Sequence, residues 1–126
     1  MTTPSGLLKE ASALSTASRT NEDRRRTVIG RAYYASYHAV LQAAEALGYS
    51  YTRGQPPFGR HEQLIGWATT QNLDPDLREA AAMLSELKTL RRVADYLLDT
   101  VIEHNHMADC LEKATYVVGE LLADEA

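Results

Sequence analysis

The sequence predicts an all-α fold, an antiparallel bundle of four to five helices in one domain spanning residues 1–126. Three observations predict it. Apolar residues recur at helical spacing, capping residues and prolines separate stretches of helix length, and no alternating apolar–polar stretch indicates a strand. A chain of 126 residues, 44% of them apolar, is long enough to bury one core.

Two helices are expected before residue 48. Residues 5–18 predict the first, because their apolar residues share one face: Leu7, Leu8, Ala11 and Leu14. Thr20 or Asn21 caps the second, whose acidic first turn suits the positive end of a helix. This long helix runs to Leu47, and Gly48 supplies the left-handed residue that ends it.

A long loop and two further helices follow. The segment GYSYTRGQPPFG (48–59) holds three glycines and two prolines, which predicts a loop. A short helix is expected over 60–71. Asp74 and Pro75 then form a start signal, a capping residue followed by proline in the first turn, for a helix over 75–99.

The last helix is expected to run to about residue 122. Thr100 and Glu103 have the spacing of a capping box at its start. The segment also holds Cys110, the single cysteine of the chain, which excludes an internal disulfide and a multi-cysteine zinc site. His106 lies four residues before it, but no further ligand is suitably spaced, so we expect neither a metal site nor a cofactor.

Composition narrows the class of protein. No apolar run approaches ~18 residues, so we expect no membrane span. The start of the chain lacks the basic and apolar regions of a signal peptide, which predicts a cytoplasmic protein. Residues 1–60 carry eight Lys/Arg against four Asp/Glu, whereas residues 61–126 carry five against thirteen. The basic half could meet phosphates, or the halves could neutralise each other within the fold or across a dimer.

The second helix carries a polar stripe on an apolar body. Residues 32–44 hold no Asp, Glu, Lys or Arg, which is typical of a helix at the centre of a bundle or at a subunit interface. Arg24, Arg31, His38 and Glu45 recur every seven residues and therefore share one face.

These side chains have two interpretations. In the functional one, His38 transfers protons and Arg31 steadies phosphate charge; in the structural one, His38 is a core histidine bonded to a facing helix. The run Arg24, Arg25 and Arg26 is either a solvated helix start or a contact for RNA phosphate. Three consecutive helical residues point in three directions, so this run predicts a collar rather than a flat patch.

The fourth helix has the most informative polar group of the chain. Arg91 occupies a heptad register that is otherwise leucine, at Leu77, Leu84 and Leu98. A buried arginine needs a partner, and Asp95 lies four residues on, at salt-bridge spacing. Arg92 has Asp95 and Tyr96 at the third and fourth positions after it. Together Arg91, Arg92, Asp95 and Tyr96 form either a structural ion pair that sets the register or a catalytic or ligand-binding site.

Three strings carry a family resemblance: GRAYYASYHAVLQAAEALG, then RHEQLIGWA, then LKTLRRVADYLLD, with an acidic helix after them. Together they resemble the HEPN superfamily of bacterial and archaeal helical proteins over about residues 25–122. The resemblance implies a bundle that commonly dimerises. It also implies a component of a toxin–antitoxin or phage-defence module, often a ribonuclease, often encoded beside a small nucleotidyltransferase.

The resemblance also implies site residues. The metal-independent nuclease signature of the family is an arginine followed, after four to six residues, by a histidine on a late helix. Arg91 or Arg92 resembles that arginine, but Tyr96 to Asp99 supply no histidine, and a tyrosine is a poor base near neutral pH. Arg31 and His38 have the right spacing on the earlier helix and could form a composite site with Arg91 or Arg92.

Two functions follow from these observations. In the first, the protein is an RNA-binding or RNA-cleaving effector of such a module, in which the arginines contact phosphate and His38 transfers protons. In the second, it is a non-catalytic HEPN protein whose helices bind a partner, such as a nucleotidyltransferase, or a nucleotide. The missing late-helix histidine leaves enzymatic activity unassigned. A homodimer is expected in either case.

Overall fold

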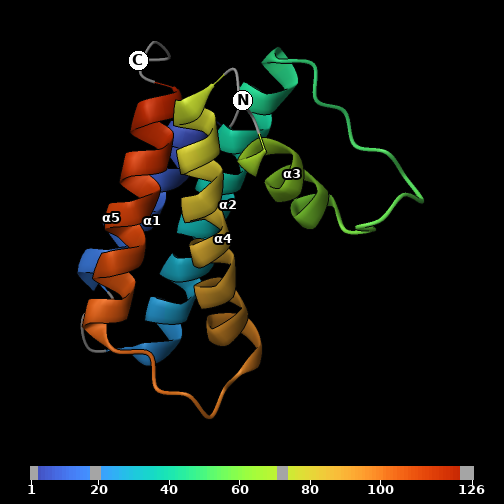
Figure 1. Ribbon diagram of the computed structural model, residues 1–126. Helices are drawn as coiled ribbons and strands as arrows, with labels where there is room; N and C mark the ends of the chain where they lie inside the picture. The colour runs from blue at the N-terminus through green and yellow to red at the C-terminus, as the bar shows by residue number, and fades with distance from the viewer. Residues whose placement is uncertain (1–2, 18–20, 71–73, 123–126) are drawn as a thin grey trace.

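Helix α2 is the element on which the other helices pack (Figure 1). The computed structural model describes residues 3–17, 21–70 and 74–122, and over these ranges it contains helices and no strand. The five helices are α1 (Pro4–Ala17), α2 (Glu22–Ala46), α3 (Arg60–Thr69), α4 (Pro75–Tyr96) and α5 (His104–Leu121). Helices α1, α2, α4 and α5 run side by side, and α3 lies across α2 and α4 at one end. The predicted all-α bundle is confirmed.

The sequence of α2 explains its central position. Helix α2 contacts all four other helices. Its fully buried side chains include Val28, Ile29, Ala32, Tyr33 and Val40. The alanines on this helix allow the flanking helices to approach closely. Of the two positions expected for the uncharged stretch 32–44, the centre of the bundle is the one that the burial of these residues supports.

The start and end of α2 also agree with the sequence. Asn21 is the N-cap, and its side chain accepts a hydrogen bond from the Arg24 backbone N–H at 3.2 Å. Thr20, the other candidate, lies outside the described residues. Leu47 is the C-cap, and Gly48 has a φ of 99°, in the left-handed region that favours glycine.

Helix α4 is shorter than predicted, and the last helix begins differently. Helix α4 ends at Tyr96 rather than at residue 99, and the N-cap of α5 is Glu103 rather than Thr100. The reason lies on α2, where the buried guanidinium of Arg26 donates hydrogen bonds to backbone carbonyls in the last turn of α4 and just after it. These belong to Val93, Ala94, Leu97, Leu98 and Thr100.

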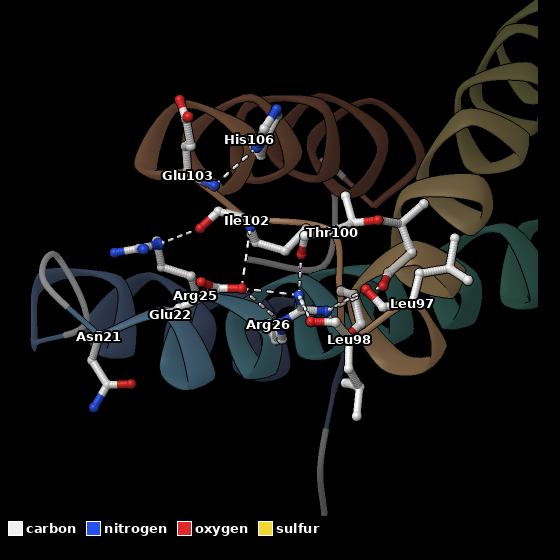
Figure 2. A network of polar contacts seen from close by, with 12 residues as sticks. Asn21, Glu22, Arg25, Arg26, Leu97, Leu98, Thr100, Ile102, Glu103 and His106 are labelled. Carbon is white, nitrogen blue, oxygen red and sulfur yellow. Dashed lines mark hydrogen bonds and ion pairs between the residues drawn. The ribbon is translucent and has the colours of Figure 1, made fainter.

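Figure 2 shows how the same region fastens the α4–α5 connection to α2. Glu22 pairs with Arg26 at 2.9 Å and accepts a hydrogen bond from the Ile102 N–H at 3.4 Å. Arg25 donates from Nε to the Ile102 carbonyl at 2.7 Å. The hydrogen bond from Arg26 lowers the pKa of Glu22 below its ordinary value, so the carboxylate stays charged.

The remaining boundaries differ little from prediction. Helix α1 covers Pro4–Ala17 against an expected 5–18, and α3 ends at Thr69 against an expected 71, with residue 18 and residues 71–73 outside the described ranges. Asp74 caps α4 by accepting from the Leu77 N–H at 3.0 Å. Within the described ranges, no helix is long and apolar enough to cross a membrane.

Candidate functional site

Helices α2, α3 and α4 meet at a cluster of rings and charges, here called the Arg91 cluster. It comprises Tyr33, Tyr34, Tyr37 and His38 from α2, His61 from α3, and Arg91 and Asp95 from α4. The four α2 residues lie at spacings of one, three and four, so they share one side of that helix. Helix α3 crosses α2 and α4 here, which brings its first turn against the tyrosines.

Arg91 is held by a carboxylate and two rings. Its Nε lies 2.8 Å from Oδ2 of Asp95, in an ion pair whose N–H does not point straight at the oxygen. Its guanidinium carbon lies 5.6 Å from the centre of the Tyr33 ring and 5.5 Å from that of Tyr34. Such cation–π contacts orient an arginine. The predicted pairing of Arg91 with Asp95 is confirmed, and the side chain keeps 21% of its surface exposed.

His61 is the residue that sequence reasoning missed as a site candidate. Its ring stacks on Tyr37 with centres 4.0 Å apart, and its Nδ1 lies 2.5 Å from the hydroxyl of Tyr33. Burial lowers the pKa of His61, and the positive charges of Arg91 and Lys88 lower it further. The signal was present in the string RHEQLIGWA, but only the fold shows that this histidine meets Arg91.

The tautomer of His61 follows from its partner. Burial raises the pKa of Tyr33 far above its ordinary value, so the hydroxyl keeps its proton. The buried hydroxyl bonds to His61, so we assign the tyrosine as donor and Nδ1 as acceptor. The remaining ring proton is then on Nε2. Neutral His61 thus presents an N–H donor rather than a base.

His38 contacts the rings of Tyr34 and Tyr37. Its ring is near parallel to that of Tyr34, with centres 6.2 Å apart, and meets the Tyr37 ring edge-on at 5.2 Å. Tyr34 therefore touches both His38 and Arg91. The composite site expected of His38 and Arg91 is thus an indirect arrangement, in which both side chains contact the ring of Tyr34.

Arg31 faces helix α1 instead. It lines an open groove of about 540 Å³ between α1 and α2, together with Leu7, Glu10, Tyr34 and His38. Its Nη1 lies 3.8 Å from a carboxylate oxygen of Glu10, and both side chains are exposed. Arg31 and His38 thus share a groove, as their seven-residue spacing predicts, while the contacts of Arg31 are with α1 rather than with Arg91.

Arg92 and Tyr96 lie on a different side of α4 from Arg91. They line a groove of about 350 Å³ with Thr89, Val93 and Leu97. Asp95 pairs with Arg91 rather than with Arg92. The predicted four-residue group therefore divides into two: the Arg91–Asp95 pair belongs to the cluster, and Arg92 and Tyr96 belong to a separate groove.

The basic run at the start of α2 is not the solvated collar expected from the sequence, because Arg25 and Arg26 both bond to the α4–α5 connection (Figure 2). Arg26 is 8% exposed and its guanidinium is bonded inside the protein, to Glu22 and to the carbonyls named above. Arg25 contacts the Ile102 carbonyl, and Arg24 is exposed. Arg26 is a structural residue, so the hypothesis of phosphate contact passes mainly to Arg24.

Comparison of the chain with protein families, with characterised proteins and with solved structures found no match. The resemblance to the HEPN superfamily thus stays a prediction. In the part of the chain that the structure describes, no three His, Cys, Asp or Glu residues gather so as to hold a metal ion. The groups that offer chemistry at the Arg91 cluster are a guanidinium, a carboxylate, two imidazoles and three phenol rings.

Proposed function

We propose that this chain is the HEPN-type component of a toxin–antitoxin or phage-defence module and binds RNA at the Arg91 cluster. One observation carries the proposal: α3 supplies His61 to the arginine whose own helix lacks a histidine. Arg91 and Nε2–H of His61 are donors of the kind that bind phosphate oxygens. The Asp95 contact is made at Nε, which leaves the Nη groups of Arg91 as donors to a phosphate.

The ring of Tyr34 adds a place for a base. It is 43% exposed between Arg91 and His38. An exposed ring beside an arginine suits an unstacked nucleotide, whose base can stack while its phosphate is neutralised. Cleavage of the bound RNA is a separate step, for which His38 is the residue proposed to transfer protons, since Nδ1 of His61 is engaged by Tyr33.

The experiment measures binding and cleavage of a mixed RNA pool in EDTA. We expect Arg91→Gln, which removes the positive charge, and His61→Phe, which keeps a ring but removes the Nε2–H donor, to weaken binding about tenfold each. Arg92→Gln is the matched control, because this neighbouring arginine lies in the other groove. Absence of binding by the wild type, or equal losses for Arg91→Gln and Arg92→Gln, would overturn the proposal. Cleavage that disappears in folded His38→Ala would make the protein a ribonuclease.

A second function is favoured by an exposed apolar corner between α4 and α5. Tyr96, Leu97, Leu98 and Val101 are each more than half exposed there, next to the groove of Arg92. Apolar side chains gathered at a surface mark sites of protein contact. We propose this corner as the binding site for a protein partner, with a nucleotidyltransferase encoded beside this chain as the first choice and a second copy of the chain as the other.

Co-purification tests this second function. The chain is produced with the product of its neighbouring gene, as wild type, as Leu98→Asp and as Leu47→Asp. Leu47 is a matched control, since it is 44% exposed at the end of α2. Loss of the partner in Leu98→Asp alone supports the corner as the contact. Retention of the partner in both variants, or a monomeric wild type that retains no partner, counts against it.

A further inference from the structure

The loop between α2 and α3 projects away from the bundle (Figure 1). We call residues 48–59 the arm. From residue 48 to residue 61 the chain carries Arg53 and Arg60 and no Asp or Glu, although the whole chain has a net charge of −4. The arm and its junction with α3 are therefore a positive projection on an acidic protein, which favours a negatively charged ligand.

The backbone of the arm is ordered by side chains. Gln63 of α3 donates to the carbonyls of Thr52 at 2.8 Å and Gln55 at 2.9 Å, and it accepts from the Thr52 N–H at 3.1 Å. Gly54 turns the chain with a φ of 83°. These hydrogen bonds hold the backbone of Thr52 and Gln55 against α3 before any ligand arrives, which reduces the conformational entropy lost on binding.

The end of the arm next to α3 presents one exposed ring, and the first residue of α3 is an arginine stacked on a ring. Phe58 is 67% exposed, although its carbonyl is held by the Tyr51 hydroxyl at 2.7 Å. The guanidinium of Arg60 lies 4.3 Å from the centre of the Tyr51 ring, which holds it in place and leaves its N–H edge for an acceptor. Arg53 is exposed nearby in sequence. An ordered backbone thus carries an exposed aromatic ring that lies, in sequence, between two arginines.

We propose that the arm binds single-stranded RNA, with Phe58 stacked on an unpaired base and Arg53 and Arg60 against the neighbouring phosphates. A ring that stacks on bases, with positive charges that follow the backbone, is the recurring means of holding single strands. A duplex buries its base faces, so the arm favours a single strand over a duplex. The inference rests on the proposed function, since RNA is the ligand of both, and adds a contact remote in sequence from Arg91.

Fluorescence anisotropy with a labelled 2′-O-methyl oligouridylate tests the arm, because this probe lacks the 2′-hydroxyl needed for cleavage. We expect Phe58→Ala to weaken binding about tenfold and Phe58→Trp to retain it. The double variant Arg53→Gln/Arg60→Gln should lower the slope of log affinity against log salt by about 1.4, since each phosphate contact to a single strand contributes about 0.7.

Matched variants elsewhere are expected to bind as the wild type does. Tyr116→Ala removes an exposed ring from α5, and Lys9→Gln/Arg78→Gln removes two charges from α1 and α4. Circular dichroism checks that each variant folds.

Four results would overturn the arm proposal. Wild-type binding that Arg91→Gln weakens and the arm variants leave unchanged would reject the arm and keep the proposed function. No binding by the wild type at low salt would reject both. A duplex bound as tightly as the single strand, or Phe58-dependent capture of a protein by a chain that binds no RNA, would assign the arm another ligand.

Discussion

Arg26 lies between the start of α2 and the end of α4, and its guanidinium contacts both. An α-helix leaves its last carbonyls without an intrahelical partner. Here a buried arginine from another helix supplies the donors, and Glu22 balances its charge. The pair joins two elements about 70 residues apart in the chain and closes the end of the bundle.

We expect Arg26→Met to destabilise the protein by about 3–5 kcal/mol, because it removes a buried charged donor from the carbonyls at the end of α4 and removes the ion-pair partner of Glu22. Arg24→Met is the control, since Arg24 is exposed two residues away, and should stay within about 0.5 kcal/mol of the wild type. Urea unfolding followed by circular dichroism measures both. Equal stabilities for the two variants would show that the hydrogen bonds of Arg26 contribute nothing.

The low pKa of His61 predicts a pH dependence of stability. Burial lowers that pKa below 6.5, so the unfolded chain binds this proton more readily than the folded protein does. The associated stability is fully present above pH 6.5 and is lost as the pH falls through the folded-state pKa of His61. Glu22 and Glu62 affect stability in a more acidic pH range, since the pKa of each is lowered from 4.5.

Urea unfolding between pH 7.5 and pH 5 measures the effect of His61, and NMR titration gives its pKa directly. Arg91→Gln should raise the pKa of His61, because a nearby positive charge is removed. Tyr33→Phe should also raise it, because the hydroxyl that bonds neutral His61 is lost. A His61 pKa at or above 6.5 in the wild type would contradict the assigned environment.

At the scale of helices, the starts of α2 and α4 were predictable and the end of α4 was not. Asn21 and Asp74 act through their own side chains on the next turn, so local sequence identifies them. Helix α4 stops at Tyr96 because of a side chain on α2, and Leu97 to Asp99 carry no stop signal of their own. Thr100 had capping spacing, but its carbonyl is used by Arg26 and the cap is Glu103.

Asp74 and Thr100 therefore give a matched pair of substitutions. Asp74→Ala should cost about 1 kcal/mol, since the Leu77 N–H loses its acceptor. Thr100→Ala should have little effect, within about 0.5 kcal/mol, because Arg26 contacts the backbone carbonyl that alanine keeps. Thermal and urea unfolding of the two variants provide the measurement. A larger loss for Thr100→Ala than for Asp74→Ala would restore the capping box expected from the sequence.

At the scale of the molecule, the sequence could identify chemical groups but not their assembly. The pairing of Arg91 with Asp95 follows from a spacing of four on one helix. The meeting of His61 with Arg91 depends on how α3 crosses α2 and α4, and no local pattern encodes that crossing. Arg91 and Arg92 were both candidates for the signature arginine, and the leucine register already set Arg91 apart, but only the packing of α4 shows that Arg91 joins the cluster and Arg92 a separate groove.

Cys110 reports on the stability of the whole bundle. It is fully buried on α5, where it contacts the Ile29 carbonyl of α2, and burial raises the pKa of its thiol to about 12. The thiolate is the reactive form, so we expect a thiol reagent at pH 8 to label Cys110 only when the bundle opens.

The labelling rate should then increase with urea concentration as the unfolded population does. The slope should equal that found in equilibrium unfolding. Ser12→Cys in a Cys110→Ala background is the control, since residue 12 is exposed on α1 and should be labelled at once. Cys110 lies between α5 and α2, so a labelling rate that does not respond to urea would mean that α5 separates from α2 without the rest of the bundle unfolding.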